Sequence, residues 1–528
     1  MYDILIKNGL IVDGRRTAPF RADLAVKDGK IASIGSAADA QALRVIDAEG
    51  LAVAPGFINI HSHSDAAPLV GYPVESAVAM GVTTEVTGNC GTSNMPCLPH
   101  AKAMLTEYFD GELQLPRQGI DVICKDLNEY GQRIAAVSSP GNYAVLIGHG
   151  TLRLNVMGFV SRIPTEEELE QMKQLLDQQL SQGAFGMSLG LIYPPSSYSE
   201  KEELIELAKV IKKHDGILTV HMRNENAGVF DSVREMIDIA EQSGVHLEIS
   251  HLKLMGKPQW GRADELLAMI DEAKARGVDI NADQYPYLAS STSLTVLVPS
   301  KDHEGGTSVM LQRLAEPTDE LLAGMAAILE SRGGANTVMV TTTHGKAVEF
   351  EGKYLDQIAE ALGTDPLHAA IELIIRCGGV ISAVFFCMDK ADMLKIMSRM
   401  DLCVGSDGYA LSYDPKYTPN NPHPRSFGTF TEFLSVVREN KLMSLEDAVF
   451  KCTGLPAQVL GIRDRGVLEE GKAADITIFD PKTVASAAEY TDSKRKPIGL
   501  PYVISAGKLI WENGSLTGEG AGALLRHE

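Results

Sequence analysis

The strongest constraint on the fold is an alternation, through the middle of the chain, of short apolar segments with stretches of helical periodicity. The apolar segments have the length of strands that are buried on both faces. Eight of them are found, at 57–60, 83–87, 144–147, 184–188, 217–220, 247–250, 278–282 and 402–405. Helical stretches follow several of them, at 165–182, 200–214, 231–243 and 263–276. Eight such units predict an α/β protein with a parallel (β/α)8 TIM-like barrel, whose functional residues lie at the carboxyl ends of the strands.

The two ends of the chain have a different texture. Residues 1–56 and 466–528 consist of short strand-like runs separated by turn residues such as Asp28-Gly29, which is typical of β-strands joined by tight turns. We expect them to pair into one small β-sandwich domain built from both termini. The barrel then occupies residues 57–465. Its stretch at about 288–378 is too long for a simple crossover and is interpreted as an inserted lid subdomain.

The charge balance limits the possible partners. The 528 residues contain 69 Asp and Glu but 48 Lys and Arg, which gives a formal net charge of −21. An acidic chain of this kind is not expected to bind nucleic acid or an anionic membrane surface, because both need basic faces. No apolar run reaches about 18 residues, so no membrane span is expected either. A small-molecule substrate is the partner that remains, and the pattern predicts no particular oligomeric state.

The N-terminus and the cysteines bear on the cellular compartment. The segment MYDILIKNGLIVDG alternates apolar and polar residues, so it reads as a strand and not as a signal peptide. The seven cysteines are odd in number and scattered along the chain, which favours free thiols over a disulfide framework. We therefore expect a cytoplasmic protein.

Side chains that can bind a metal ion fall at the carboxyl ends of five predicted strands. They are His61, His63, Cys90, His221, His251 and Asp407. Each alone would be read as structural: a hydrogen-bonded histidine, a small buried cysteine or an aspartate in a turn. If the barrel is correct, however, all six converge on one face, and six independent coincidences are a poor explanation. The sequence therefore predicts a metal site at the mouth of the barrel.

The donor set indicates which metal and which chemistry. Imidazole nitrogens with a thiolate and a carboxylate suit Zn²⁺ better than Mg²⁺ or Ca²⁺, which prefer oxygen ligands. A zinc ion with about three protein ligands and one open position activates water for attack. Asp407 would then be free to take a proton from that water and pass it to a leaving nitrogen. This combination predicts metal-assisted hydrolysis.

Several segments resemble a known family. The segment 56–65, Gly-Phe-Ile-Asn-Ile-His-Ser-His-Ser-Asp, with later strand-end histidines and a split β domain, resembles the amidohydrolase superfamily. The segments Gly-Asn-Cys-Gly at 88–91 and Ser-His-Leu-Lys at 250–253 are more specific. They resemble the N-acyl-D-amino-acid deacylases, also called D-aminoacylases, and the likeness runs through nearly the whole chain.

The resemblance implies roles for individual residues. The tightly held zinc would be bound by Cys90, His221 and His251, and His61 and His63 would form a weaker second site. Asp407 would be the catalytic acid and base. The fourth-strand lysine that carries a carbamate in many members of the superfamily is absent from the segment 183–190, so the second site is not expected to be fully occupied.

The same resemblance implies residues that bind the substrate. Lys253, Tyr287, Arg425 and Tyr193 follow four of the strands and match positions that hold the substrate α-carboxylate and carbonyl. Arg425 is the strongest candidate, because a guanidinium binds a carboxylate with two hydrogen bonds. The segment 289–300 contains no charged residue, which favours a neutral or hydrophobic D-amino-acid side chain.

The sequence thus predicts a zinc-dependent hydrolase that cleaves N-acyl-D-amino acids to a carboxylate and a free D-amino acid. One alternative is a cyclic-amide hydrolase of the hydantoinase or dihydroorotase type, which shares the barrel and the metals. Another is a non-catalytic scaffold with an amidohydrolase fold. The missing fourth-strand lysine and the Gly-Asn-Cys-Gly segment count against the first alternative, and the retained ligands with Asp407 count against the second.

Overall fold

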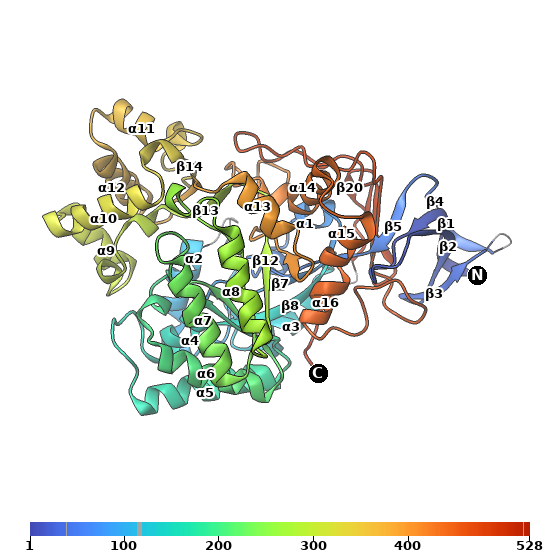
Figure 1. Cartoon of the computed structure of the whole chain (residues 1–528), viewed down its shortest axis with the longest axis horizontal. Helices are drawn as coiled ribbons and strands as arrows, with labels where there is room; N and C mark the ends of the chain where they lie inside the picture. Colours follow the sequence, from blue (N-terminus) through green and yellow to red (C-terminus); the bar gives the residue numbers. More distant parts are fainter. Residues whose placement is uncertain (38–39, 113–118, 521) are drawn as a thin grey trace.

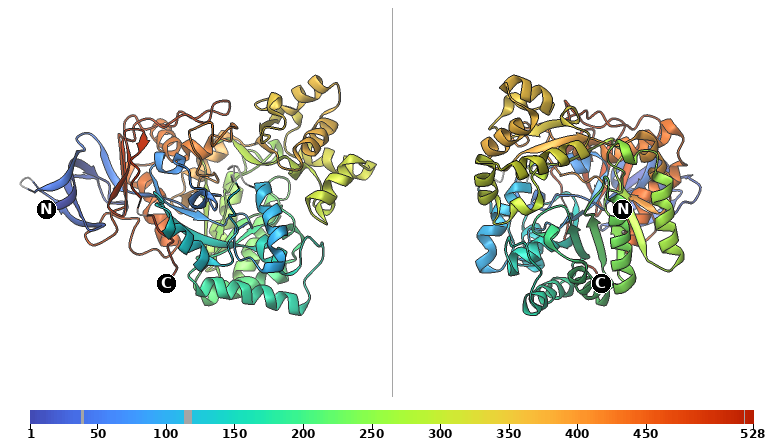
Figure 2. Two further views of the ribbon diagram at one scale, coloured as in Figure 1. Left: turned by 180° about the vertical axis from the view of Figure 1, so that it is seen from behind. Right: turned by 60° about the vertical axis from the view of Figure 1, so that its left-hand side comes forward.

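A computed structural model describes residues 1–37, 40–112, 119–520 and 522–528. The molecule is elongated, and three parts follow one another along its long axis (Figure 1). A β-rich unit that contains the N-terminus lies at one end, the barrel lies in the middle, and a largely helical unit from the middle of the sequence lies at the other end. The view from behind shows the same order (Figure 2).

Eight parallel strands form the barrel sheet, in the order β6-β7-β8-β9-β10-β11-β12-β16. They are β6 (Phe57–Asn59), β7 (Val82–Thr87), β8 (Asn142–Gly148), β9 (Gly186–Gly190), β10 (Ile217–His221), β11 (His246–Ile249), β12 (Ile280–Gln284) and β16 (Leu402–Val404). All eight predicted strands are confirmed. The ring is completed just beyond the first and last strands, where Asp407 N–H donates to His61 O at 2.9 Å and His63 N–H donates to Gly408 O at 2.8 Å.

Helices follow the strands and cover the outside of the barrel (Figure 1). They are α1 (Ser76–Ala79), α2 (Lys102–Glu112), α3 (Leu127–Ala136), α4 (His149–Val156), α5 (Glu166–Ser181), α6 (Lys201–Lys213), α7 (Val229–Ser243), α8 (Ala263–Ala275), α13 (Lys390–Met397), α14 (Arg425–Asn440), α15 (Leu445–Cys452) and α16 (Gly454–Val459). The four predicted helices correspond to α5–α8. The start of α5 is fixed by a capping box, in which Thr165 and Glu168 each accept a hydrogen bond from the other's backbone N–H.

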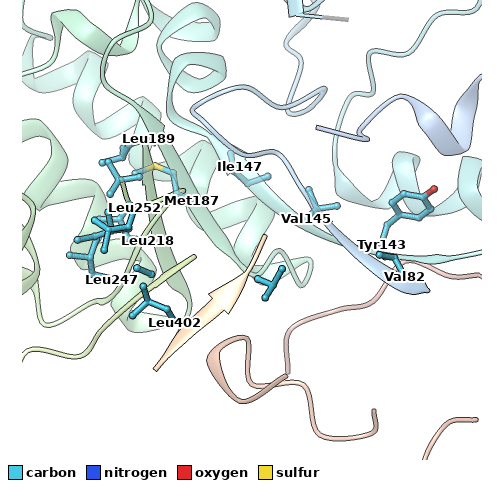
Figure 3. Close-up of a cluster of buried hydrophobic side chains, with 14 of the residues drawn as sticks. Val82, Tyr143, Val145, Ile147, Met187, Leu189, Leu218, Leu247, Leu252 and Leu402 are labelled. Atoms are coloured by element: carbon cyan, nitrogen blue, oxygen red, sulfur yellow. The ribbon is translucent and has the colours of Figure 1, made fainter. Parts of the chain in front are cut away.

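The packing follows from the two-residue period of the strands. In β8, Val145 and Ile147 belong to the large core between the strands and the helices, which also holds Met187 of β9 (Figure 3). Their neighbours Ala144 and Leu146 belong to a separate cluster together with residues of α15 and α16. Because alternate side chains point to opposite faces, each barrel strand is buried on both faces, as its apolar sequence predicts.

Strands from both ends of the chain join one nine-stranded sheet. They are β1 (Tyr2–Ile11), β2 (Phe20–Lys27), β3 (Lys30–Gly35), β4 (Ala42–Asp47), β5 (Ala52–Pro55), β17 (Ile476–Phe479), β18 (Tyr502–Ser505), β19 (Lys508–Glu512) and β20 (Ser515–Leu516). The two ends meet where β5 pairs antiparallel with β17. The expected β unit built from both termini is thus present, as a single sheet. The domain boundaries at residues 56/57 and 465/466 stay predictions.

The inserted part, between β12 and β16, has a sheet and a core of its own. It contains β13 (Ala289–Ser293), α9 (Thr307–Ala315), α10 (Asp319–Ser331), β14 (Val338–Thr342), α11 (Leu355–Leu362), α12 (Pro366–Cys377) and β15 (Ser382–Phe386). Strand β15 lies between the other two strands, so the unit extends past residue 378. Its apolar cluster draws almost entirely on its own residues. None of the described helices of the protein has both the length and the apolar character that crossing a membrane requires.

The terminal sheet gives a prediction about stability. Ile6 on β1 is fully buried in the core of this sheet, whereas Val45 on the neighbouring β4 is 51% exposed. Ile6→Ala should lower the free energy of unfolding by about 2–5 kcal/mol, because it leaves a cavity. Val45→Ala should change it by no more than about 0.5 kcal/mol. Urea unfolding followed by circular dichroism measures both, and equal midpoints for the two variants would contradict the packing described.

Candidate metal centre and substrate cavity

The carboxyl ends of the barrel strands bring the predicted metal-binding residues together. Five of the six are buried, and the side chain of His63 is 19% exposed. Cys90 Sγ lies 3.4 Å from His61 Nε2, 3.8 Å from His221 Nδ1 and 3.6 Å from His251 Nε2. Two ligands of a tetrahedral zinc ion are about 3.6 Å apart when the Zn–S and Zn–N bonds have their usual lengths. Cys90 Sγ thus lies at this kind of distance from a ring nitrogen of each of three histidines.

The bonding capacity of these side chains also fits a metal ion. The donor atoms of His61, Cys90, His251 and Asp407 all lie within 4.8 Å of one another. Nε2 of His221 is buried and has no hydrogen-bond partner among the described residues. Burial raises the pKa of the Cys90 thiol well above its ordinary value, so a thiolate here needs a compensating cation. A cluster of sulfur, nitrogen and oxygen donors of this kind suits zinc or a similar transition metal.

The backbone around the cluster is unusual. Cys90, His251 and Asp407 have φ values of 51°, 39° and 51°, in the left-handed region that non-glycine residues seldom adopt. Just before Cys90, Gly88 has a φ of 79°, and a Cβ on it would lie 1.9 Å from the carbonyl oxygen of Leu146. Only glycine fits there. Strained backbone of this kind is characteristic of functional sites.

Two carboxylates that the sequence analysis did not select orient the histidines. Asp283, at the end of β12, accepts from His61 Nδ1 at 3.1 Å and from the backbone N–H of His251 at 3.0 Å. Glu225 Oε1 lies 3.1 Å from His251 Nδ1. Carboxylates in these positions fix the ring orientation and leave the other ring nitrogen for a metal. The available sequence signal for Asp283 was its position near the end of a predicted strand. Glu225 lies in the loop that follows β10 and had no such signal.

Asp407 lies between the histidines and an arginine. Its Oδ1 is 3.0 Å from His63 Nε2, and its Oδ2 accepts from Arg425 Nη1 at 2.6 Å. Burial acts to raise the pKa of Asp407, but the charges of Arg425, His251 and His61 outweigh burial and hold that pKa well below its ordinary value. Asp407 is therefore ionised and can accept a proton.

A small cavity of about 70 Å³ opens at the cluster, and a larger one of about 580 Å³ adjoins it between the barrel and the inserted unit. Lys253, Tyr193 and Arg425 line the small cavity, as the sequence analysis expected. Tyr287 does not: its ring packs against His423, with centroids 5.2 Å apart. The buried hydroxyl of Tyr285 has no hydrogen-bond partner among the described residues, and this side chain lines the cavity instead. Of these two tyrosines, Tyr285 is thus the one that lines the small cavity.

The ammonium group of Lys253 is already engaged. Its Nζ lies 2.6 Å from Glu225 Oε1 and 2.8 Å from His251 Nδ1. Burial acts to raise the pKa of Glu225, but the charges of Lys253, His221 and His251 hold it well below its ordinary value. The two side chains form a buried ion pair behind the cluster.

The sequence profile of the amidohydrolase family matches residues 44–511. The chain belongs to the amidohydrolase family. Within the family it is 34% identical to a D-aminoacylase of Alcaligenes xylosoxydans xylosoxydans over 525 residues, which cover 99% of this chain and 97% of that protein. It is also 34% identical to an N-acyl-D-glutamate deacylase of the same organism, over 96% of this chain and 93% of that one. The resemblance found in the sequence is thereby confirmed.

Solved structures of the family agree with the fold. The N-acyl-D-glutamate deacylase of Bordetella bronchiseptica, solved with zinc and a phosphonate inhibitor, superimposes with a TM-score of 0.83 at 33% identity and covers 99% of each chain. A D-aminoacylase structure gives a TM-score of 0.83 at 32% identity over 100% of both chains. A D-hydantoinase reaches a TM-score of 0.55 at 19% identity over 100% of this chain and 99% of that one, a likeness of fold alone.

The buried Lys253–Glu225 pair gives a prediction about the metal-free amidohydrolase. Glu225→Gln should lower the free energy of unfolding by about 3–5 kcal/mol, because it leaves the ammonium of Lys253 buried without an anion. Adding Lys253→Met to that variant should recover much of the loss. Glu265→Gln, which breaks an exposed pair with Arg262, should cost about 1 kcal/mol or less. Unfolding curves recorded after chelation measure all of these, and a double variant no more stable than Glu225→Gln would contradict the pairing.

Proposed function

We propose that this amidohydrolase is a zinc-dependent hydrolase that cleaves the amide bond of N-acyl-D-amino acids, giving a carboxylate and a free D-amino acid. The observation that carries the proposal is the gathering of Cys90, His221, His251 and Asp407 around a small cavity, which adjoins a wider cavity of about 580 Å³. The similarity over nearly the whole chain to proteins named D-aminoacylase and N-acyl-D-glutamate deacylase supports it.

Cys90, His221 and His251 would hold the tightly bound zinc ion, and His61 and His63 would contribute to a weaker second site. When bound, the ion acts as a Lewis acid that polarises the acyl carbonyl and makes water a stronger nucleophile. The close approach of His61 to Cys90, at 3.4 Å, supports two adjoining sites. Asp283 and Glu225 would keep the histidine rings in the orientation that binding requires.

Asp407 would move the proton. Its carboxylate is ionised, so Oδ1 can take the proton of the attacking water and then deliver it to the amide nitrogen as the C–N bond breaks. The hydrogen bond from Arg425 to Oδ2 holds the carboxylate in one orientation and leaves Oδ1 toward the histidines. Arg425 is thus a positioning residue for Asp407.

The substrate would be held by groups around the same cavity. Arg425 also donates to Ser291 O at 3.1 Å, and the guanidinium has further N–H groups that can bind an α-carboxylate. The ring of Tyr285 lies against Arg425, whose Cζ is 5.3 Å from the ring centroid, and the Tyr285 hydroxyl has no hydrogen-bond partner among the described residues. Lys253 and Tyr193 complete the wall. Apolar residues of the wide cavity, among them Leu191, Met255 and Val296, support a neutral or hydrophobic D-amino-acid side chain.

We also propose a cytoplasmic location. All seven cysteines are free thiols and are buried, an arrangement that persists in a reducing compartment.

Two variants test the division of roles. Cys90→Ala should lose bound zinc, because it removes the thiolate ligand. Asp407→Asn should retain zinc and lose at least about 100-fold in kcat, because it removes the proton acceptor. Elemental analysis and turnover of N-acetyl-D-leucine measure both. Cys97→Ala, which removes a buried thiol outside the cluster, is the matched control and should match the wild type. Full zinc content in Cys90→Ala, or full activity in Asp407→Asn, would contradict the assignment.

A substrate panel tests the reaction itself. N-acetyl-D-leucine and N-acetyl-D-methionine should be hydrolysed, their L-enantiomers and hydantoin should be hydrolysed much more slowly, and chelation should abolish turnover until zinc is restored. Release of the free amino acid is measured by derivatisation and chromatography. Preferred hydrolysis of hydantoin would favour the cyclic-amide alternative, and bound zinc without turnover of any amide would favour the scaffold.

A further inference from the structure

One cation of the cavity walls has no anionic partner among the described residues. Arg332 follows α10 in the inserted unit and lines both the small cavity at the cluster and the wide cavity beside it. Its Nε is buried without a hydrogen-bond partner, and its guanidinium forms no ion pair or hydrogen bond within the part of the chain that the structure describes. A buried N–H group without a partner in a native protein calls for an explanation.

The other cations of these cavities are neutralised. Arg425 Nη1 lies 2.6 Å from Asp407, Lys253 Nζ lies 2.6 Å from Glu225, and Arg223 Nη2 lies 2.9 Å from Glu235. Among the described residues that line the small cavity, Arg332 is therefore the Lys or Arg side chain without a carboxylate partner.

The arginine is also held in place. Its Cζ lies 4.9 Å from the ring centroid of Phe385, a fully buried residue of β15. A cation–π contact with a fixed ring orients the planar guanidinium without using its N–H donors. The group is thus presented to the cavity with its capacity for a two-point carboxylate interaction intact.

We propose that Arg332 binds a second carboxylate at the far end of the substrate's acyl group, so that the enzyme favours neutral or hydrophobic D-amino acids whose N-acyl group is itself anionic. The proposal rests on the proposed deacylase function. The first carboxylate is the α-carboxylate, for which Arg425 and Tyr285 lie beside Asp407. Arg332 instead lies where the small cavity opens into the wide one, on the inserted unit and not on the barrel.

The wide cavity leaves room for the extra group. Its volume is about 580 Å³, and apolar side chains such as Met255, Met310 and Ile328 contribute to its wall. The carboxylate of Glu107 on α2 also lines this cavity but does not line the small one that Arg332 reaches. The second carboxylate is assigned to the end of a dicarboxylic acyl group, because this leaves the amino-acid side chain neutral, as the apolar residues of the cavity and the uncharged segment 289–300 favour. An acidic side chain is the competing source, and the experiment separates the two.

The experiment compares three substrates in the zinc-loaded enzyme and in Arg332→Met, which keeps an apolar chain over Phe385 without the charge. N-acetyl-D-leucine has one carboxylate, N-succinyl-D-leucine has a second one on the acyl group, and N-acetyl-D-glutamate has a second one on the side chain. Arg332→Met should lower kcat/KM by about 10- to 100-fold for N-succinyl-D-leucine, the usual effect of losing a charged hydrogen bond, and by less than about 3-fold for N-acetyl-D-leucine. A loss confined to N-acetyl-D-glutamate would assign Arg332 to an acidic side chain and overturn the proposal.

Controls separate this role from a structural one. Arg332→Lys should restore part of the lost kcat/KM, chiefly through KM, because it returns the charge without the planar fork. Arg376→Met removes a similar arginine of the inserted unit, one that lies over Phe350 and pairs with Glu349, and should leave all three substrates unaffected. Circular dichroism melting checks that each variant is folded.

The results that overturn the proposal are specific. Equal losses on all three substrates would assign Arg332 to the α-carboxylate or to structure, and no loss on either dianionic substrate would remove it from recognition. If the wild-type enzyme hydrolyses N-acetyl-D-leucine in the same assay, these results overturn only the role of Arg332, and the deacylase function stands. If the wild type hydrolyses none of the three substrates, the deacylase function itself fails.

Discussion

The structure depends on the compensation of buried charge at the open end of the barrel. A thiol, several imidazoles and a carboxylate converge there with almost no exposure to water, and such groups are costly to bury unless they are paired. The protein supplies part of the pairing itself: Asp283 behind His61, Glu225 behind His251 and Lys253, and Arg425 behind Asp407. The donor atoms of His61, Cys90, His251 and Asp407 lie within 4.8 Å of one another. Such a group of donors is what a metal centre requires.

The division of the molecule into three parts follows from that requirement. The barrel holds its polar cluster rigidly, because its strands are packed on both faces and its first and last strands are joined beside His61 and Asp407. The inserted unit has a separate core and adds walls to the cavity without adding ligands to the cluster. Such an arrangement lets the chemistry and the choice of substrate be set by different segments of the chain.

The sequence is informative where the structure is regular. The eight strands and their helices could be predicted because two periodicities alternate, and the cluster could be predicted because the carboxyl ends of parallel strands share one face. Glu225 was not selected because its role depends on the orientation of a ring on another strand. The resemblance pointed to Tyr287, but Tyr285 and Tyr287 both follow β12. Which of the two lines the cavity is decided by tertiary packing, which the sequence does not show. Arg332 could not be predicted as a cavity residue, because the sequence does not show how the inserted unit packs against the barrel.

X-ray absorption at the zinc edge of the purified protein tests the central claim most directly. The account predicts a sulfur atom in the coordination shell at about 2.3 Å, with nitrogen or oxygen neighbours at about 2.0–2.1 Å. The sulfur signal should vanish when Cys90 is replaced and should persist when Cys97 is replaced. A shell of nitrogen and oxygen alone in the unaltered protein would contradict it.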